Sequence, residues 1–136
     1  MLFENLLAQL DKLDLPSDQY AITSSGALAV RKIREAHDLD IIVTDKLWNE
    51  FVQKYPVKKG QDCDNIFIGD IQIMGNFYIK PEEDKYPVNE QIDTADIIEG
   101  KRYVNLNIIK FYKQQWGRPK DLQDIKMIDN YLKLNK

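Results

Sequence analysis

The chain has 136 residues, a formal net charge of −3 and one cysteine. This length fits one domain and not two, and the slight negative charge argues against a protein that coats nucleic acid through bulk positive charge. A lone cysteine excludes an intramolecular disulfide, the first residues lack the basic segment of a signal peptide, and no apolar run is long enough to cross a membrane, so we expect a cytoplasmic protein without membrane association.

In the first half of the chain, predicted helices and strands alternate. Leucines at helical spacing indicate the first helix, and Thr44 is a suitable N-cap for the third. The expected elements are a helix over 2–13, a strand over 20–23, a turn at 24–26, a helix over 27–35, a strand over 39–43 and a helix over 45–54.

The second half begins with strands and ends with helices. Gly69-Asp70 lies between two apolar runs and predicts a hairpin with a two-residue turn. Asn105 can cap a helix that Gly117 ends, and Pro119 suits the first turn of another. The expected elements are strands at 66–68 and 71–79, a loop at 80–94 with room for one helical turn, a small hairpin over 97–104, a helix over 106–116, and a last helix with the core stripe Leu122, Ile125, Ile128 and Leu132.

This order of elements predicts an α/β (α+β) fold, with a small mixed sheet flanked by helices and two helices at the C-terminal end. We expect one domain, with a core over about residues 14–104 and a helical part over 105–136.

Two carboxylates lie on the clearest predicted strand. Alternate side chains of a strand share a face, so Asp38 and Asp40 point together, away from the apolar residues around them. Like charges at this spacing repel each other, and a hard cation such as Mg²⁺ removes the repulsion while it also binds substrate phosphates. Taken alone, an Asp-x-Asp pair is more often a solvated strand end.

A turn of small residues lies upstream, in Ile22-Thr23-Ser24-Ser25-Gly26-Ala27-Leu28, and the segment predicts strand, turn and helix. Small residues let backbone N–H groups approach a phosphate, and the start of a helix favours negative charge. The Ser25 hydroxyl could donate a hydrogen bond to a phosphate oxygen. Taken alone, an ordinary turn with serine caps is again the simpler explanation.

Together, the segments from Ile22 to Val43 resemble the signature of the polymerase β-like nucleotidyltransferase superfamily: an apolar strand, Gly-Ser, a helix, and Asp-x-Asp on the next strand. The resemblance is strongest to the small minimal and aminoglycoside-type members. The run from Lys113 to Ile125 is similar to the Lys…Gly-Arg-x-Lys-Asp-x-x-Asp-Ile run of those proteins, and the likeness spans about residues 18–134. It implies the nucleotidyltransferase fold.

The resemblance implies an enzyme that uses Mg²⁺ or Mn²⁺ and a nucleoside triphosphate, ATP in the first place, to transfer NMP, as AMP, to a hydroxyl acceptor. Asp38 and Asp40 would bind the metal and act in catalysis. The residues implied for phosphate binding are Ser24, Ser25, Gly26, Lys113, Arg118 and Lys120. For the three cations, an ordinary helix start is an equally good explanation.

Two positions depart from the family pattern. Ser24 stands where the family has glycine, and serine fits only if the backbone needs no positive φ or if its surroundings offset the strain. Gln72 stands where a third carboxylate is expected, and an amide cannot act as a carboxylate base. Asp70, Asp62 and Asp64 could substitute, although turn chemistry explains them more simply.

Gln72 therefore favours a second hypothesis, a catalytically degenerate nucleotide-binding or protein-interaction module, for example in a toxin–antitoxin or defence pair. The acceptor stays open: a protein, an RNA or a small molecule, with room for it at a homodimer interface. Tyr78 and Trp116 are the aromatic residues to compare with a bound base.

Overall fold

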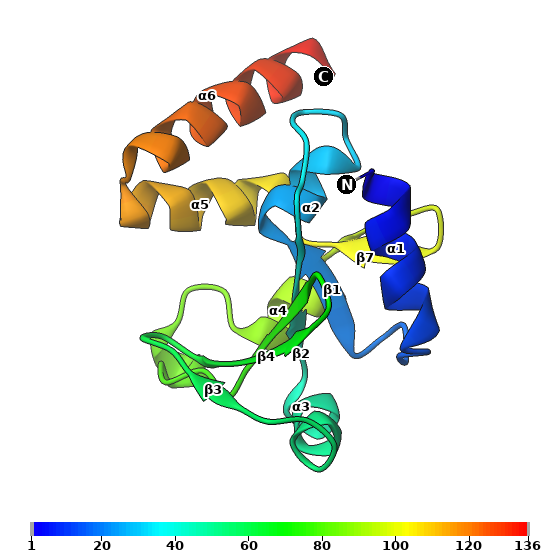
Figure 1. Cartoon of the computed structure of the whole chain (residues 1–136). Coiled ribbons are helices and arrows are strands. Elements are labelled where there is room, and N and C mark those ends of the chain that lie inside the picture. Colours follow the sequence, from blue (N-terminus) through cyan, green and yellow to red (C-terminus); the bar gives the residue numbers. More distant parts are fainter. Residues whose placement is uncertain (1, 136) are drawn as a thin grey trace.

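The computed structural model describes residues 2–135, and within them one mixed sheet of seven strands has the order β3-β4-β5-β2-β1-β7-β6 (Figure 1). The strands are β1 Tyr20–Thr23, β2 Leu39–Val43, β3 Lys58–Lys59, β4 Asp64–Ile68, β5 Ile71–Gly75, β6 Asp96–Ile98 and β7 Lys101–Tyr103. The helices are α1 Phe3–Lys12, α2 Ser24–Ala29, α3 Asp45–Val52, α4 Val88–Asp93, α5 Leu106–Trp116 and α6 Pro119–Leu134, with a 3₁₀ turn over Pro81–Glu83.

Strand β2 lies at the centre of the sheet. This strand, which carries Asp40 and is called the acidic strand below, pairs antiparallel with β1 and parallel with β5. Its two neighbours therefore run in opposite directions. Strand β1 also pairs in parallel with β7, where Ile22 is the partner of Tyr103. The hairpins β4–β5 and β6–β7 complete the two sides, and α5 and α6 lie side by side at one end of the sheet (Figure 1).

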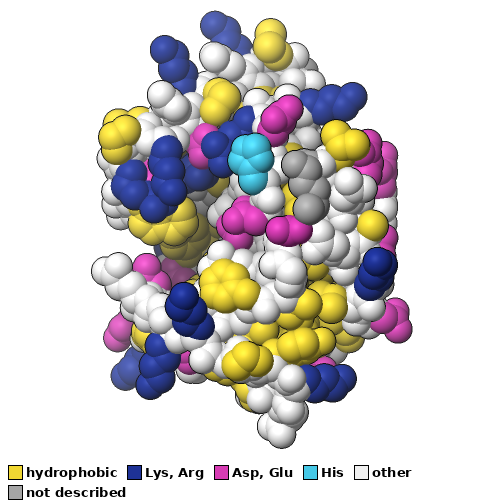
Figure 2. Space-filling model, in the orientation of Figure 1, with side chains coloured by type: hydrophobic (Ala, Val, Ile, Leu, Met, Phe, Trp, Pro, Cys, Tyr) yellow, Lys and Arg dark blue, Asp and Glu magenta, His cyan; other side chains and the backbone are white. Residues whose placement is uncertain are grey.

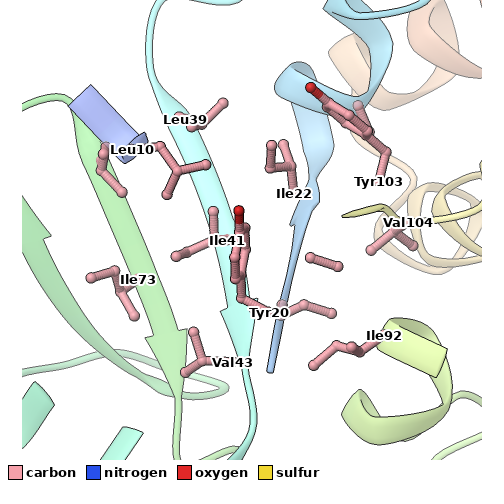
Figure 3. Close-up of a cluster of buried hydrophobic side chains, with 14 of the residues drawn as sticks. Leu10, Tyr20, Ile22, Leu39, Ile41, Val43, Ile73, Ile92, Tyr103 and Val104 are labelled. Carbon is pink, nitrogen blue, oxygen red and sulfur yellow. The ribbon is translucent and has the colours of Figure 1, made fainter. Parts of the chain in front are cut away.

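The apolar face of β2 is anchored in the core. Leu39, Ile41 and Val43 are almost fully buried, and Figure 3 shows them together with Leu10 of α1 and Ile73 of β5. Burying an aliphatic side chain of this size contributes about 1.5–3 kcal/mol relative to exposure. This packing fixes the strand, and alternation then directs Asp40 to the opposite face.

Most local predictions are confirmed. The β4–β5 hairpin has a two-residue turn, with Gly69 at φ +58°, a backbone conformation that glycine adopts without strain. Thr44 accepts a hydrogen bond from the Leu47 N–H at the start of α3. Asn105 caps α5, and Gly117 ends it in the left-handed conformation.

The predicted turn at 24–26 and helix over 27–35 are wrong, because α2 begins at Ser24 and ends at Ala29. Lys32 has φ +60°, its N–H donates to the Ala29 carbonyl at 2.9 Å, and the Ile33 N–H donates to the Leu28 carbonyl at 3.0 Å. This is the hydrogen-bond pattern that closes helices through a left-handed residue.

Three further boundaries differ from the prediction. Strand β5 ends at Gly75 and does not continue to Ile79. The segment 80–94, expected to be a loop with one helical turn, contains a 3₁₀ turn and the six-residue helix α4. Strand β3 was not expected, because its two exposed lysines give no apolar pattern; lysines are common on sheet edges, where they discourage further pairing.

The predicted stripe of α6 is also partly wrong. Ile128 is fully buried as expected, but Leu122 is 57% exposed. The buried face instead includes Asp121 and Asp124, whose charges are matched by the buried Lys113 of α5. A sequence stripe of apolar residues cannot reveal such a face, because its polar members are paired only after the two helices meet. Among the described residues, none of the helices has the length and apolar character needed to span a membrane.

Candidate active site

A row of polar side chains crosses the middle of the sheet. Thr23 of β1 is the register partner of Asp40 of β2, and Asp40 is the partner of Gln72 of β5. Neighbouring strands lie about 4.8 Å apart, so the three residues are close neighbours on one face. The structure thus places Gln72 beside Asp40, at the position expected for a third carboxylate.

Asp40 is shielded from water and incompletely paired. Its Oδ1 atom is buried and has no hydrogen-bond partner within residues 2–135. Burial and, second, the charge of Asp38 raise its pKa to about 6, while Lys113 and Lys120 act in the opposite direction. A buried carboxylate oxygen without a partner is unfavourable, and a bound cation would relieve both the missing contact and the repulsion.

Asp38 lies directly before β2 and is exposed to solvent. Within the described part of the chain, no group of three or more His, Cys, Asp or Glu side chains could hold a metal ion. Two carboxylates are still a suitable protein contribution for Mg²⁺, which commonly takes its other ligands from water and substrate phosphates. The unpaired Asp40 oxygen beside Asp38 therefore fits a divalent cation.

The chain passes directly from β1 into α2 over residues 23–25, called the 23–25 turn below, and its backbone is strained where the resemblance implies glycine. Ser24 has φ +53°, a left-handed conformation that costs a non-glycine residue about 1–2 kcal/mol. The backbone therefore does need a positive φ there, and serine adopts it. Ser25, in the first turn of α2, is buried.

Gly26 has a packing role in this structure. A Cβ atom at this position would lie 2.7 Å from Ile22 and 2.8 Å from Leu39, closer than real Cβ atoms come to their neighbours. The glycine allows α2 to pack tightly on β1 and β2. It thereby sets the distance between the 23–25 turn and the acidic strand.

The three predicted cations occupy different surroundings. Lys113 is buried, and its Nζ lies 2.9 Å from Asp124 and 3.6 Å from Asp121. Its positive charge lowers the pKa of Asp40. Lys120 is exposed and acts on Asp40 more weakly. The structure brings Lys113 to the site and leaves Lys120 at its solvent side.

Arg118 is held by its own helix. Its Nε donates to Asp121 Oδ2 at 2.6 Å, its Nη2 donates to Asp121 Oδ1 at 3.2 Å, and its guanidinium lies 5.3 Å from the ring centre of Trp116. The ion pair with Arg118 lowers the pKa of Asp121. In this conformation Arg118 stabilises the start of α6, the alternative that the sequence left open.

The candidate replacements for the third carboxylate have other partners. Gln72 Nε2 donates to Asn65 Oδ1 at 2.8 Å, which holds the amide in place. Asp70 lies in the β4–β5 turn, where its Oδ2 accepts from Gln9 Nε2 at 2.9 Å. Both side chains therefore have structural contacts that explain them.

Asp64 is fixed by hydrogen bonds from the Tyr78 hydroxyl and from Asn76 Nδ2, the latter at 2.7 Å, and these bonds lower its pKa. The Tyr78 hydroxyl is held by Asp64, and Tyr78 is not among the residues that line the cavity described below, whereas Trp116 is. Asp62 is exposed and borders a cavity that the sequence did not reveal.

This cavity has a volume of about 170 Å³ and lies on the Asp40 face of the sheet, against α4 and α5. Figure 2 shows a hollow with hydrophobic side chains inside it and Lys and Arg side chains above it. The walls are formed by Thr23, Ser24, Ile42, Asp62, Met74, Phe77, Ile79, Asp84, Val88, Gln91, Val104, Ile108, Ile109, Tyr112, Lys113 and Trp116. Most of these side chains look like ordinary core residues in the sequence, and no local signal marks Asp84.

Comparison with known proteins supports the fold. No family model matches the chain, and no curated protein sequence matches it. Among solved structures, TM1012 of Thermotoga maritima, a protein proposed to be a nucleotidyltransferase, is similar over 96% of both chains, with a TM-score of 0.60 and 15% identity. ANT(2″)-Ia in complex with adenylyl-2″-tobramycin is similar over 95% of this chain and 86% of its own, with a TM-score of 0.54 and 17% identity. The predicted fold is confirmed.

Proposed function

We propose that this chain, which has the nucleotidyltransferase fold, binds a nucleoside triphosphate with Mg²⁺ or Mn²⁺ and transfers the nucleoside monophosphate to a hydroxyl acceptor. The observation that carries the proposal is Asp40, a buried carboxylate with an unpaired oxygen next to a second carboxylate and a buried lysine. Two known proteins of this shape, one of them holding an adenylylated product, support the same chemistry.

Each site residue has a distinct role in this proposal. Asp38 and Asp40 would hold the cation, which when bound neutralises the triphosphate and polarises the phosphorus under attack. Lys113 supplies fixed positive charge on the opposite wall, where Asp124 keeps its ammonium in place. The 23–25 turn presents backbone N–H groups and small side chains toward the same space.

The transfer balances as a displacement at the α-phosphorus. The acceptor oxygen forms a bond to phosphorus, the bond to pyrophosphate breaks, and the hydroxyl proton passes to solvent, because Gln72 cannot accept it. ATP is the expected donor, and catalysis would come mostly from positioning and from fixed charge.

One observation favours a second candidate, a protein that binds the nucleotide without turnover. Gln72 occupies the register position beside Asp40, and its amide is held by Asn65. An amide bound in this way neither takes a proton nor gives a second cation an anionic ligand.

The first experiment is a calorimetric titration of Mg²⁺ with each of the four ribonucleoside triphosphates. We expect wild type to bind at least one of them in a Mg²⁺-dependent manner, and Asp40→Asn to lose this binding by tenfold or more. Asp129→Asn, an exposed acid of α6, is the matched control and should bind as wild type does. A folded wild-type protein that binds no triphosphate would contradict the proposal.

A second measurement separates the two candidates. Transfer of the label from α-labelled triphosphate to water or an added alcohol is followed for wild type and for Gln72→Asp. Turnover by wild type supports the enzyme. Turnover by Gln72→Asp alone supports a binding protein that has lost its third carboxylate.

A further inference from the structure

The cavity beside Asp40 has ends of different charge. At one end, Thr23, Ser24 and the buried Lys113 lie next to the acidic strand. The exposed Asp62 and the half-buried Asp84 also border the cavity, on segments outside that strand. The charge of Lys113 is matched by Asp121 and Asp124, so the carboxylates of Asp62 and Asp84 are the uncompensated charges of the wall.

Apolar walls lie between these polar groups. They come from the sheet, with Ile42 and Met74, and from α5, with Ile108 and Ile109. The volume of about 170 Å³ is close to the engineered apolar cavity of about 150 Å³ that binds benzene. A single six-membered ring therefore fits between the apolar walls.

Asp84 is held as a carboxylate acceptor at the wall. The Tyr112 hydroxyl donates to its Oδ1 at 2.5 Å. Burial and, second, this hydrogen bond keep the pKa of Tyr112 above its usual range. Tyr112 also borders the cavity, so an aromatic ring and a fixed carboxylate lie together. Such a pair favours a ligand with an apolar body and a positive charge.

We infer that this cavity binds the acceptor of the transfer, a small single-ring alcohol or phenol that carries an amine, with the amine near Asp62 and Asp84 and the hydroxyl toward Asp40. That the ligand is the acceptor rests on the proposed function, whereas the chemical class of the ligand follows from the cavity alone. It assigns a small molecule to a role that the sequence left open among proteins, RNA and small molecules.

The test uses three probes of one shape: tyramine, the neutral 4-ethylphenol, and the anion 3-(4-hydroxyphenyl)propanoate. Binding to the nucleotide-free protein is measured by ligand-observed NMR. We expect tyramine to bind about two- to fivefold more tightly than 4-ethylphenol, the size of a partly exposed charge interaction, and the anion to bind most weakly. Asp62→Asn should reduce the tyramine advantage and leave 4-ethylphenol unchanged, whereas Asp93→Asn, an exposed acid outside the cavity wall, should change neither.

Three results would overturn the inference: no probe binds, the anion binds as tightly as tyramine, or saturating Mg²⁺–ATP displaces tyramine, which would make the cavity a site for the base. The two proposals fail separately. Tyramine binding in a protein that binds no triphosphate would remove the transfer reaction and keep the ligand class, and triphosphate binding without probe binding would do the reverse.

Discussion

Carboxylates on the sheet side and on the helical side of Lys113 are shielded from water, but their surroundings differ. On the sheet side, Asp40 has an unpaired oxygen and a raised pKa, and the nearby Ser24 holds a strained backbone. On the helical side, Asp121 and Asp124 are more deeply buried, yet each is in an ion pair.

The difference separates two uses of a buried charge. Paired carboxylates join α5 to α6, and through Arg34, 3.5 Å from Asp124, they also join α6 to the segment before β2. The unpaired carboxylate and the strained serine lower the stability of the empty protein and persist because the surrounding structure holds them in place. We therefore expect substitutions on the two sides to change stability in opposite directions.

The largest effect is expected for Asp124→Asn. Removing one partner of a buried ion pair costs about 3–5 kcal/mol, because Lys113 then keeps a buried charge with only Asp121 at 3.6 Å. Urea denaturation at neutral pH measures the loss. A loss below about 1 kcal/mol would show that the packing of α5 on α6 does not depend on the Lys113–Asp124 ion pair.

Asp40→Asn should instead stabilise the metal-free protein. The pKa of about 6 in the folded protein lies above the usual aspartate value of 3.8, so the folded state binds more protons than the unfolded state, and stability falls as pH rises through this window. Asp40→Asn should therefore raise the free energy of unfolding by about 3 kcal/mol at most. This gain is fully present above pH 6 and absent below pH 3.8. Urea denaturation with EDTA at several pH values checks it, and a gain that does not change with pH would contradict the assignment to Asp40.

Ser24→Gly should stabilise the protein by about 0.5–1 kcal/mol. Relief of the left-handed strain, about 1–2 kcal/mol, exceeds the extra entropy that glycine loses on folding. Ser25→Gly is the matched control, since Ser25 lies inside α2 and glycine is unfavourable there by about 1 kcal/mol relative to the best helix formers. Thermal unfolding of both variants distinguishes strain at position 24 from a general effect of glycine.

The smallest effect is expected for Asp129→Asn. Asp129 pairs with Lys110 at 2.6 Å on the same two helices, but its side chain is 48% exposed, and such pairs contribute about 0–1 kcal/mol. Unfolding at low and high salt should show a small loss that salt reduces. A loss as large as that of Asp124→Asn would mean that burial does not explain the larger contribution of the Lys113–Asp124 ion pair.

The features that could be predicted from the sequence are those that neighbouring residues determine. The β1 and β2 strands follow from short β-branched runs, and the caps at Thr44 and Asn105 follow from side-chain chemistry within one turn. Alternation along β5 placed Gln72 on its polar face, and the resemblance to the family indicated its position beside Asp40.

The features that could not be predicted depend on residues far apart in the chain. The φ of Ser24 is imposed where α2 packs on the sheet, and the burial of Asp121 becomes visible only when Lys113 and Arg118 are beside it. The cavity combines β1, β2, β5, α4 and α5, so its residues carry no common local pattern. The early end of α2 also could not be predicted. Lys32 adopts the left-handed conformation that glycine or asparagine usually adopts at a helix end.

The parallel pairing of Ile22 with Tyr103 has a consequence for how the protein folds. The two residues are about eighty positions apart, and β1 is bordered on its other side by the acidic strand. Loop closure of this length must precede the contacts that reward it, which slows folding relative to a helical bundle of the same size. During synthesis, the 23–25 turn therefore leaves the ribosome long before its flanking strand β7 exists, and the site, which includes Lys113, can form only after residue 113 has been made.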